Sequence, residues 1–214
     1  MTPDRRRGSR VRLVVLAIAS AAVVVGGVGP TASLVGHSGH RTALDMRGQS
    51  VALDPGVTPV PAASAQADIG TRLQVPSVEL DVPLGALTAV DGQITPPGFT
   101  SAYWIRNMGV PVADSSRGTV FVVMHSLRNG GIGPGNYLTD VATQTARVRD
   151  GAIVRIAGVT FTVTGSDLIS KSTIATDSTV WSATPNRLLL ITCLEHPDGS
   201  LSTENLVVTA KRSS

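Results

Sequence analysis

After residue 70 the chain alternates between short apolar, β-branched runs and turn residues, a pattern typical of β-strands. Between Val159 and Thr164 apolar residues alternate with threonines, which predicts a strand with one buried face. Ala157-Gly158, just before it, predicts a hairpin turn. A helical turn is expected only near Tyr137–Val141. The expected strands are Arg72–Val75, Val78–Val82, Thr119–Met124, Ala152–Ile156, Val159–Thr164, Leu188–Thr192 and Leu206–Ala210. Strands this short and this numerous predict an all-β sandwich or closed barrel.

The N-terminal part has a different pattern, an uncharged apolar run that follows a basic flank. The run spans Leu13–Val28 and continues weakly to Gly36, and the flank holds Arg5, Arg6, Arg7, Arg10 and Arg12. This order is typical of a signal peptide or a signal anchor, and the extended run approaches the roughly 20 residues that cross a bilayer. The positive-inside rule places the arginines in the cytoplasm and the rest of the chain outside. We expect a membrane anchor at residues 13–36; a cleaved signal peptide and a buried core helix are the alternatives.

Residues 37–70 are predicted to be a linker, because they have closely spaced prolines and no apolar period to bury. The chain therefore divides into three parts. Residues 1–36 are a cytoplasmic basic flank and signal anchor, residues 37–70 an extracytoplasmic linker, and residues 71–214 a β domain.

Composition and charge exclude several classes of protein. The chain has 214 residues, a net charge of +3 and a pI near 9.6, but its first 12 residues carry +4 and the other 202 carry −1. The body therefore lacks the basic surface that nucleic-acid binding requires. With 42% hydrophobic and 15% charged residues, the chain is not a disordered tail protein. Its only cysteine, Cys193, excludes a disulfide scaffold and a structural zinc set.

Cys193 is the chemically informative residue of the body. A lone cysteine in an exported protein is buried and inert, awaits an intermolecular partner, or acts as a nucleophile. Cys193 ends the apolar run from Leu188, and turn residues follow it. We expect this strand end to fix the position of the thiol and to expose it at a loop. His125 ends the run Thr119–Met124 in the same way, before the glycine-rich loop Ser126–Gly135. A thiol and an imidazole at strand ends suit nucleophilic catalysis.

Several segments resemble one known family in order along the chain. Leu189-Leu190-Ile191-Thr192-Cys193 is similar to the signature T-L-x-T-C of the sortases, the cysteine transpeptidases of Gram-positive cell envelopes. Leu73–Pro83 resembles the opening strand pair of that family, and Asp150–Val154 resembles its "G-D-x-V-x-V" strand entry. Glu204–Val208 resembles the "D-N-V-V-V" ending of class F, with class E the next most similar group. The resemblance covers about residues 70–212.

The resemblance implies a closed β-barrel of about eight strands on a single-pass membrane protein, with the catalytic domain outside the cell membrane. It implies cleavage of an LPxTG-type C-terminal sorting signal between threonine and glycine. Cys193 would attack the threonine carbonyl and hold the substrate as a thioester, while His125 would protonate the leaving amine. The acceptor would be an amine of a peptidoglycan precursor or of a pilin. A thiolate beside an imidazolium supplies nucleophile and acid, so no metal or organic cofactor is implied.

Three departures from the family pattern keep other interpretations open. Met124 stands where a glycine is usual, and Leu189 replaces the first threonine of the signature. The family's arginine in the last strand falls on Thr203 or Asn205, so we expect these neutral donors, or Arg128 in the loop after His125, to position the substrate carbonyl. One alternative is a degenerate sortase that serves as a binding or assembly protein. The other is an unrelated exported β domain that binds envelope polymer.

The charge asymmetry at the N-terminus generates a prediction about topology. We expect residues 37–214 to lie outside the membrane and residues 13–36 to stay in the mature protein, since arginines resist translocation. Protease treatment of protoplasts, followed by N-terminal sequencing of the membrane-bound fragment, measures both. A soluble secreted form that begins near Gln66 as the major species would contradict the anchor.

Overall fold

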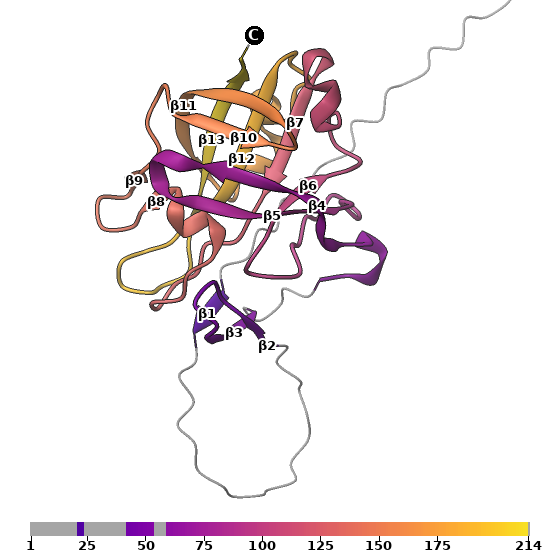
Figure 1. Ribbon diagram of the computed structural model, residues 1–214. Coiled ribbons are helices and arrows are strands. Elements are labelled where there is room, and N and C mark those ends of the chain that lie inside the picture. Colours follow the sequence, from indigo (N-terminus) through magenta and orange to yellow (C-terminus); the bar gives the residue numbers. More distant parts are fainter. Residues whose placement is uncertain (1–20, 24–41, 54–58, 214) are drawn as a thin grey trace, which may run out of the picture.

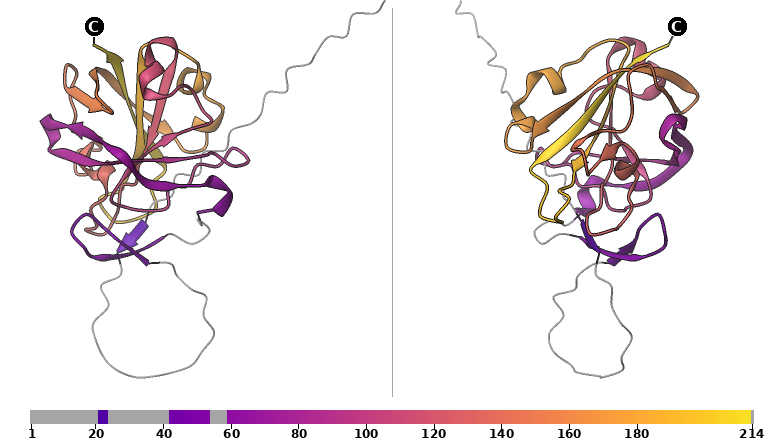
Figure 2. Two further views of the ribbon diagram at one scale, coloured as in Figure 1. Left: turned by 45° about the vertical axis from the view of Figure 1, so that its right-hand side comes forward. Right: turned by 90° about the vertical axis from the view of Figure 1, so that its left-hand side faces the viewer.

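The computed structural model describes residues 21–23, 42–53 and 59–213. Among these residues, eight strands form a closed barrel in the order β10-β11-β13-β12-β7-β6-β5-β4, and β4 pairs with β10 to complete the ring (Figures 1 and 2). The barrel, rather than the sandwich, is therefore the correct all-β architecture. Its strands are β4 (Gln66–Val75), β5 (Leu80–Leu87), β6 (Ala102–Ile105), β7 (Thr119–Val123), β10 (Ile153–Ile156), β11 (Val159–Ser170), β12 (Arg187–Leu194) and β13 (Glu204–Arg212).

Short elements connect these strands. A two-stranded sheet lies between β7 and β10, and its strands are β8 (Thr139–Asp140) and β9 (Thr145–Ala146). One short helix, α1 (Ser178–Trp181), occurs between β11 and β12 in the described part of the chain. The 3-10 turns are η1 (Pro61–Ala63), η2 (Pro76–Val78), η3 (Val112–Arg117), η4 (Pro134–Tyr137) and η5 (Ile174–Thr176).

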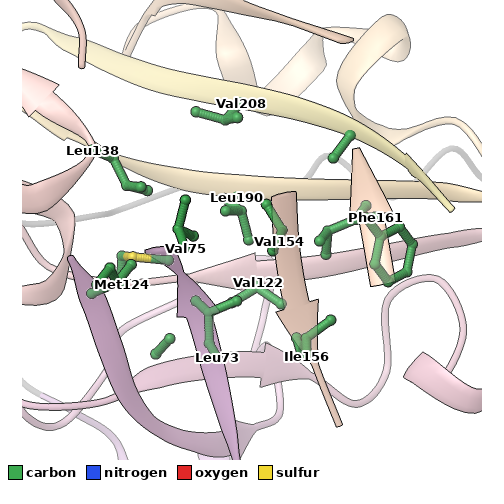
Figure 3. Packing of buried hydrophobic residues seen from close by; sticks show 14 of the residues in the cluster. Leu73, Val75, Val122, Met124, Leu138, Val154, Ile156, Phe161, Leu190 and Val208 are labelled. Carbon is green, nitrogen blue, oxygen red and sulfur yellow. The ribbon is translucent and has the colours of Figure 1, made fainter. Parts of the chain in front are cut away.

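Alternate side chains of the strands fill the barrel interior, as the two-residue period of a β-strand requires. Figure 3 shows this cluster, in which β4, β7, β10, β11, β12 and β13 all contribute apolar side chains. Among its members are Leu73, Val75, Val122, Met124, Leu138, Val154, Ile156, Phe161, Leu190 and Val208.

A second apolar cluster covers the outer face of the barrel over β6, β7, β12 and β13. Leu189 and Ile191 of β12 belong to it, together with Ile94 from the β5–β6 connection and with Ile174 and Val180 from the β11–β12 connection. β12 is therefore buried on both faces. Two-sided burial explains why its apolar run is uninterrupted in sequence instead of alternating.

All seven predicted strands are present in the structure, with shifted ends. β6 was not predicted, because its four residues are all apolar and show no alternation with polar residues. The helical turn expected at Tyr137–Val141 is wrong: η4 begins earlier, at Pro134, and Thr139–Asp140 is a strand. The side chain of Asn136 holds η4 in place, since its Oδ1 accepts hydrogen bonds from the Leu127 and Gly133 backbone N–H groups at 2.8 Å.

The predicted β10–β11 hairpin turn is confirmed. Ala157 and Gly158 have φ values of 46° and 78°. Positive φ at both central residues is the requirement of a type I′ turn, whose twist matches that of the paired strands.

The N-terminal region differs from the predicted organisation at two points. Within residues 37–70, β2 (Thr42–Leu44) and β3 (Ser50–Leu53) form a hairpin, and β4 begins at Gln66 instead of residue 71. Of the predicted anchor, Ala21–Val23 form β1, which pairs with β3, and the rest lies outside the described residues. No helix in the described residues is long and apolar enough to cross a membrane.

Candidate active site

Strand register places His125 beside Cys193. β7 and β12 are parallel, and their ladder ends at the pair Val123 and Ile191. The Met124 N–H donates to the Ile191 carbonyl at 3.1 Å, which extends the same register by one residue. One further step brings His125 level with Cys193, and neighbouring strands are about 4.8 Å apart. This continuation of the register beyond the end of β7 is the basis on which we place the imidazole next to the thiol.

Asn205 lies on the other side of the thiol. β12 and β13 are antiparallel, and Cys193 is paired directly with Asn205 in their register. Residues in direct register on adjacent strands point to the same face of a sheet. His125, two residues beyond the end of β7, thus lies in a row with Cys193 of β12 and Asn205 of β13, on the outer face that also carries Val123, Ile191 and Val207. We call these three residues the candidate row.

The candidate row is buried. His125, Cys193 and Asn205 each have 0% exposed surface, so the expectation that a strand end would expose the thiol is wrong. The reason is the apolar cluster on this face, in which Cys193 packs together with Ile94 and Ile174 from the two flanking connections.

The imidazole of His125 is held by the β5–β6 connection. Its Nε2 lies 2.9 Å from the carbonyl oxygen of Pro96. A carbonyl oxygen only accepts, so Nε2 carries a hydrogen and donates it, and Nδ1 is the nitrogen that gains or loses a proton. The ring of Phe99 meets the imidazole edge-on, with centroids 5.0 Å apart and an interplanar angle of 68°. These contacts fix both the tautomer and the orientation of the ring.

Tyr103 in turn anchors this connection. Its ring is 1% exposed, and burial raises the pKa of Tyr103 to about 12, although hydrogen bonds with Ser101 and the Gly98 backbone act in the opposite direction. The phenol is therefore neutral throughout the neutral pH range. Because Gly98 lies between Pro96 and Phe99, this hydrogen bond restrains the segment that contacts His125.

The side chain of Asn205 differs from that of His125 in its hydrogen bonding. Neither Nδ2 nor Oδ1 has a hydrogen-bond partner within the described residues. A buried polar group without a partner costs about 1–3 kcal/mol of stability. An amide kept at this cost next to a buried thiol is available to bind a substrate group.

A second contact ties the two strand ends together below the row. Ser126 Oγ and Thr192 Oγ1, from the residues that flank His125 and Cys193, are 3.0 Å apart and share a hydrogen bond. The loop after His125 folds back over this pair, since Gly135 N–H donates to the His125 carbonyl at 2.8 Å. A Cβ atom on Gly135 would overlap Thr192 Oγ1, so only glycine fits at this position.

The other two predicted site residues make contacts with the loop between β12 and β13. Thr203 is exposed, and its Oγ1 lies 3.3 Å from His196 Nε2 in the loop between β12 and β13. Arg128 is half-buried and donates from Nη1 to the Gly199 carbonyl at 2.8 Å, which ties the His125 loop to that same loop. Of the three predicted substrate-positioning residues, the structure brings only Asn205 into direct register with Cys193.

Several contacts around the row were not predicted. Pro96 contacts His125 through its backbone carbonyl, and a backbone contact cannot be recognised from the residue type. Phe99 lies in a segment without apolar periodicity. Ser126 and Thr192 could have been found, because each directly flanks a predicted catalytic residue. Within the described residues, no group of three or more His, Cys, Asp or Glu side chains is placed to hold a metal ion.

No protein-family model matches the sequence, and no curated protein matches it significantly. Several solved structures are similar to this chain, and sortases are among them. Sortase A from Listeria monocytogenes is 19% identical, with a TM-score of 0.48 over 70% of this chain and 89% of that one. Sortase C-1 from Actinomyces oris is 15% identical, with a TM-score of 0.47 over 67% and 71%. Sortase C2 of Group B Streptococcus Pilus Island 1 is 14% identical, with a TM-score of 0.47 over 70% and 76%.

The tight fit of Gly135 generates a stability prediction. Gly135→Ala should lower the free energy of unfolding by roughly 1–3 kcal/mol, because the new methyl group overpacks the Ser126–Thr192 contact. Gly165→Ala is the matched control, since a Cβ there would meet nothing within 4 Å. Urea unfolding followed by tryptophan fluorescence compares the two variants, and equal midpoints would contradict the proposed packing.

Proposed function

We propose that this protein is a sortase-type cysteine transpeptidase that acts outside the cell membrane on proteins with an LPxTG-type C-terminal sorting signal. The candidate row is the observation that supports this proposal most strongly. An inert core cysteine needs only apolar neighbours, whereas Cys193 is paired with an unpartnered amide on β13 and is level with an imidazole just beyond the end of β7. These are the groups that acyl transfer requires: a nucleophile, a proton carrier and a hydrogen-bond donor.

In the first half-reaction the Cys193 thiolate attacks the threonine carbonyl carbon of the sorting signal. A bond forms between Sγ and this carbon, the threonine–glycine C–N bond breaks, and the imidazolium of His125 gives its Nδ1 proton to the leaving amine. In the second half-reaction an amine of a peptidoglycan precursor or a pilin attacks the thioester. Nδ1 of His125 then takes a proton from this amine, and the thiolate leaves.

Asn205 completes the mechanism on the opposite side of the thiol. The carbonyl oxygen gains negative charge as Sγ attacks, and a fixed donor at that point lowers the barrier. The Nδ2 group of Asn205 is a neutral donor with no competing acceptor among the described residues, so it can meet this oxygen without first breaking another bond. A neutral hydrogen bond is about half as strong as a charge-assisted one, so we expect a slow enzyme.

Burial of the row sets a condition on substrate entry. His125, Cys193 and Asn205 have no exposed surface, so one of the covering segments has to move before a peptide reaches the thiol. This closed arrangement also favours the second candidate function, a sortase-like barrel that binds envelope components without catalysis. Turnover distinguishes the two candidates.

The decisive experiment incubates the protein with an LPxTG-type peptide and hydroxylamine, which captures the thioester as a hydroxamate. We expect hydroxamate from the wild type and none from Cys193→Ala. His125→Ala should slow its formation by about 10²–10⁴-fold, the usual contribution of a general acid. His196→Ala, a histidine outside the row, is the matched control and should retain activity. Absence of hydroxamate from folded wild-type protein would support the binding function instead.

Asn205 generates a prediction that combines rate and stability. Asn205→Ala should slow cleavage by about 10²-fold or more, as expected when an oxyanion donor is removed. It should not lower the melting temperature, because it removes a buried polar group without a hydrogen bond. Thr203→Ala should cost much less activity, since Thr203 is exposed and contacts His196. If Arg128→Ala alone abolished cleavage, the guanidinium of Arg128 would be the hydrogen-bond donor to the oxyanion, and Asn205 would not be.

A further inference from the structure

The hairpin formed by β2 and β3, which replaces part of the predicted linker, is built around one buried carboxylate. Asp45 is 2% exposed, and its Oδ1 accepts hydrogen bonds from the Arg47 and Gln49 N–H groups at 2.8 Å each. Asp45 N–H also donates to the Gln49 carbonyl at 2.9 Å. These bonds form the turn of the hairpin and occupy one oxygen of the carboxylate.

The second carboxylate oxygen binds a different part of the protein. Asp45 Oδ2 accepts a hydrogen bond from the Ile132 N–H at 3.1 Å, and the Met46 N–H donates to the Ile132 carbonyl at 2.9 Å. Ile132 lies in the loop between β7 and η4, which begins immediately after His125. Two hydrogen bonds thus connect the hairpin to the loop that directly follows the proposed catalytic histidine.

The apolar side of the hairpin makes a second connection. Val51 is 0% exposed and packs in one cluster with Phe99 and Leu127. Phe99 is the residue whose ring contacts His125, and Leu127 is two residues beyond the histidine. The hairpin therefore holds both segments that flank the imidazole, the β5–β6 connection and the loop after β7.

The location of the hairpin agrees with these contacts. The C-terminus marks the far end of β13, so the start of β13 and the ends of β7 and β12 lie at the opposite end of the barrel. Figures 1 and 2 show the small sheet of β1, β2 and β3 beside that end.

We propose that the β2–β3 hairpin positions His125 for acyl transfer, with Asp45 and Val51 as its positioning residues. The inference rests on the proposed function, since it assigns a role in that reaction. A proton carrier works only when its ring is held at hydrogen-bond distance from the reacting group, and a misplacement of about 1 Å costs about 10²-fold in rate. The hairpin supplies this restraint through the backbone of Ile132 and the ring of Phe99.

The Asp45 carboxylate can keep its hydrogen bonds throughout the neutral pH range, because it stays ionised there. Burial raises the pKa of Asp45, but hydrogen bonds from the Gln49, Ile132 and Arg47 backbones, together with the Arg47 charge, outweigh this effect and hold it below the usual range. Asp45 is therefore ionised at neutral pH. Its hydrogen bonds to backbone N–H groups are charge-assisted and stronger than neutral ones.

The test uses the full chain with the substitution Asp45→Asn. Asparagine keeps an oxygen for the turn at Arg47 and Gln49, but its NH2 group replaces the oxygen that accepts from Ile132. The change thus breaks the bond between hairpin and loop and preserves the hairpin. We expect kcat for hydroxamate formation to fall about 10-fold or more, with KM within twofold and an unchanged unfolding midpoint of the barrel.

Val51→Ala tests the apolar connection, with Leu44→Ala as its matched control. Both variants shorten an aliphatic side chain of the same hairpin, but Leu44 is 58% exposed. Val51→Ala should lower kcat and Leu44→Ala should leave it unchanged. The proposal is overturned if Asp45→Asn and Val51→Ala both retain the wild-type kcat. It is also overturned if they raise kcat, because the hairpin would then be a cover over the site.

NMR spectra of the His125 ring separate this inference from the proposed function. A released imidazole should show a shifted Cε1–H signal and a changed titration midpoint in Asp45→Asn, while the signal of His196 stays constant. Such a shift supports the positioning contact even where the peptide is not a substrate. An unchanged His125 signal contradicts it even where the wild type cleaves the peptide.

Discussion

The register of β12 between β7 and β13 is the constraint on which the candidate site depends. A slip of one residue would turn Cys193 from the covered outer face into the barrel interior. Leu188 and Leu190 pack inside the barrel, while Leu189 and Ile191 pack in the outer cluster, so a slip would exchange both sets at once. The same burial that stabilises the barrel therefore aligns the thiol with its two polar neighbours.

The two neighbours of the thiol are held in opposite ways. His125 is restrained by the Pro96 carbonyl and the Phe99 ring, which determine its tautomer and orientation. Asn205 is restrained by its strand alone, and its amide has no partner among the described residues. In the proposed reaction, the restrained imidazole is the proton carrier, and the Asn205 amide gains a hydrogen-bond partner only when a substrate carbonyl binds. Stability lost at Asn205 is consistent with a group that functions in a bound complex.

The sequence predicted the strands of the barrel well, because each strand has its own local pattern of apolar residues. It also placed Cys193 and His125 at strand ends; in the structure β12 ends one residue after Cys193 and β7 ends two residues before His125. The parallel pairing of the two strands depends on barrel closure, which has no local signal in the sequence. The burial of the row could not be predicted, since the covering residues lie in connections without periodicity. The role of the hairpin could not be predicted either, because its contact with the rest of the protein joins Asp45 and Ile132, which are 87 positions apart in the chain.

The resemblance to sortases places the family's arginine on Thr203 or Asn205, and the burial of Asn205 gives a physical reason for a neutral residue at the second of these positions. A guanidinium with no solvent exposure needs a paired anion, and an unpaired buried charge costs several kcal/mol. A buried amide without a partner costs only about 1–3 kcal/mol, which a barrel with this much two-sided apolar packing can tolerate. In a site closed to water, the dipole of a fixed amide acts through a lower effective dielectric constant than it would at the surface. In the proposed function, burial of the row and a neutral donor at Asn205 are therefore linked, because burial raises the cost of a charge at this position and strengthens the hydrogen bond that the amide donates.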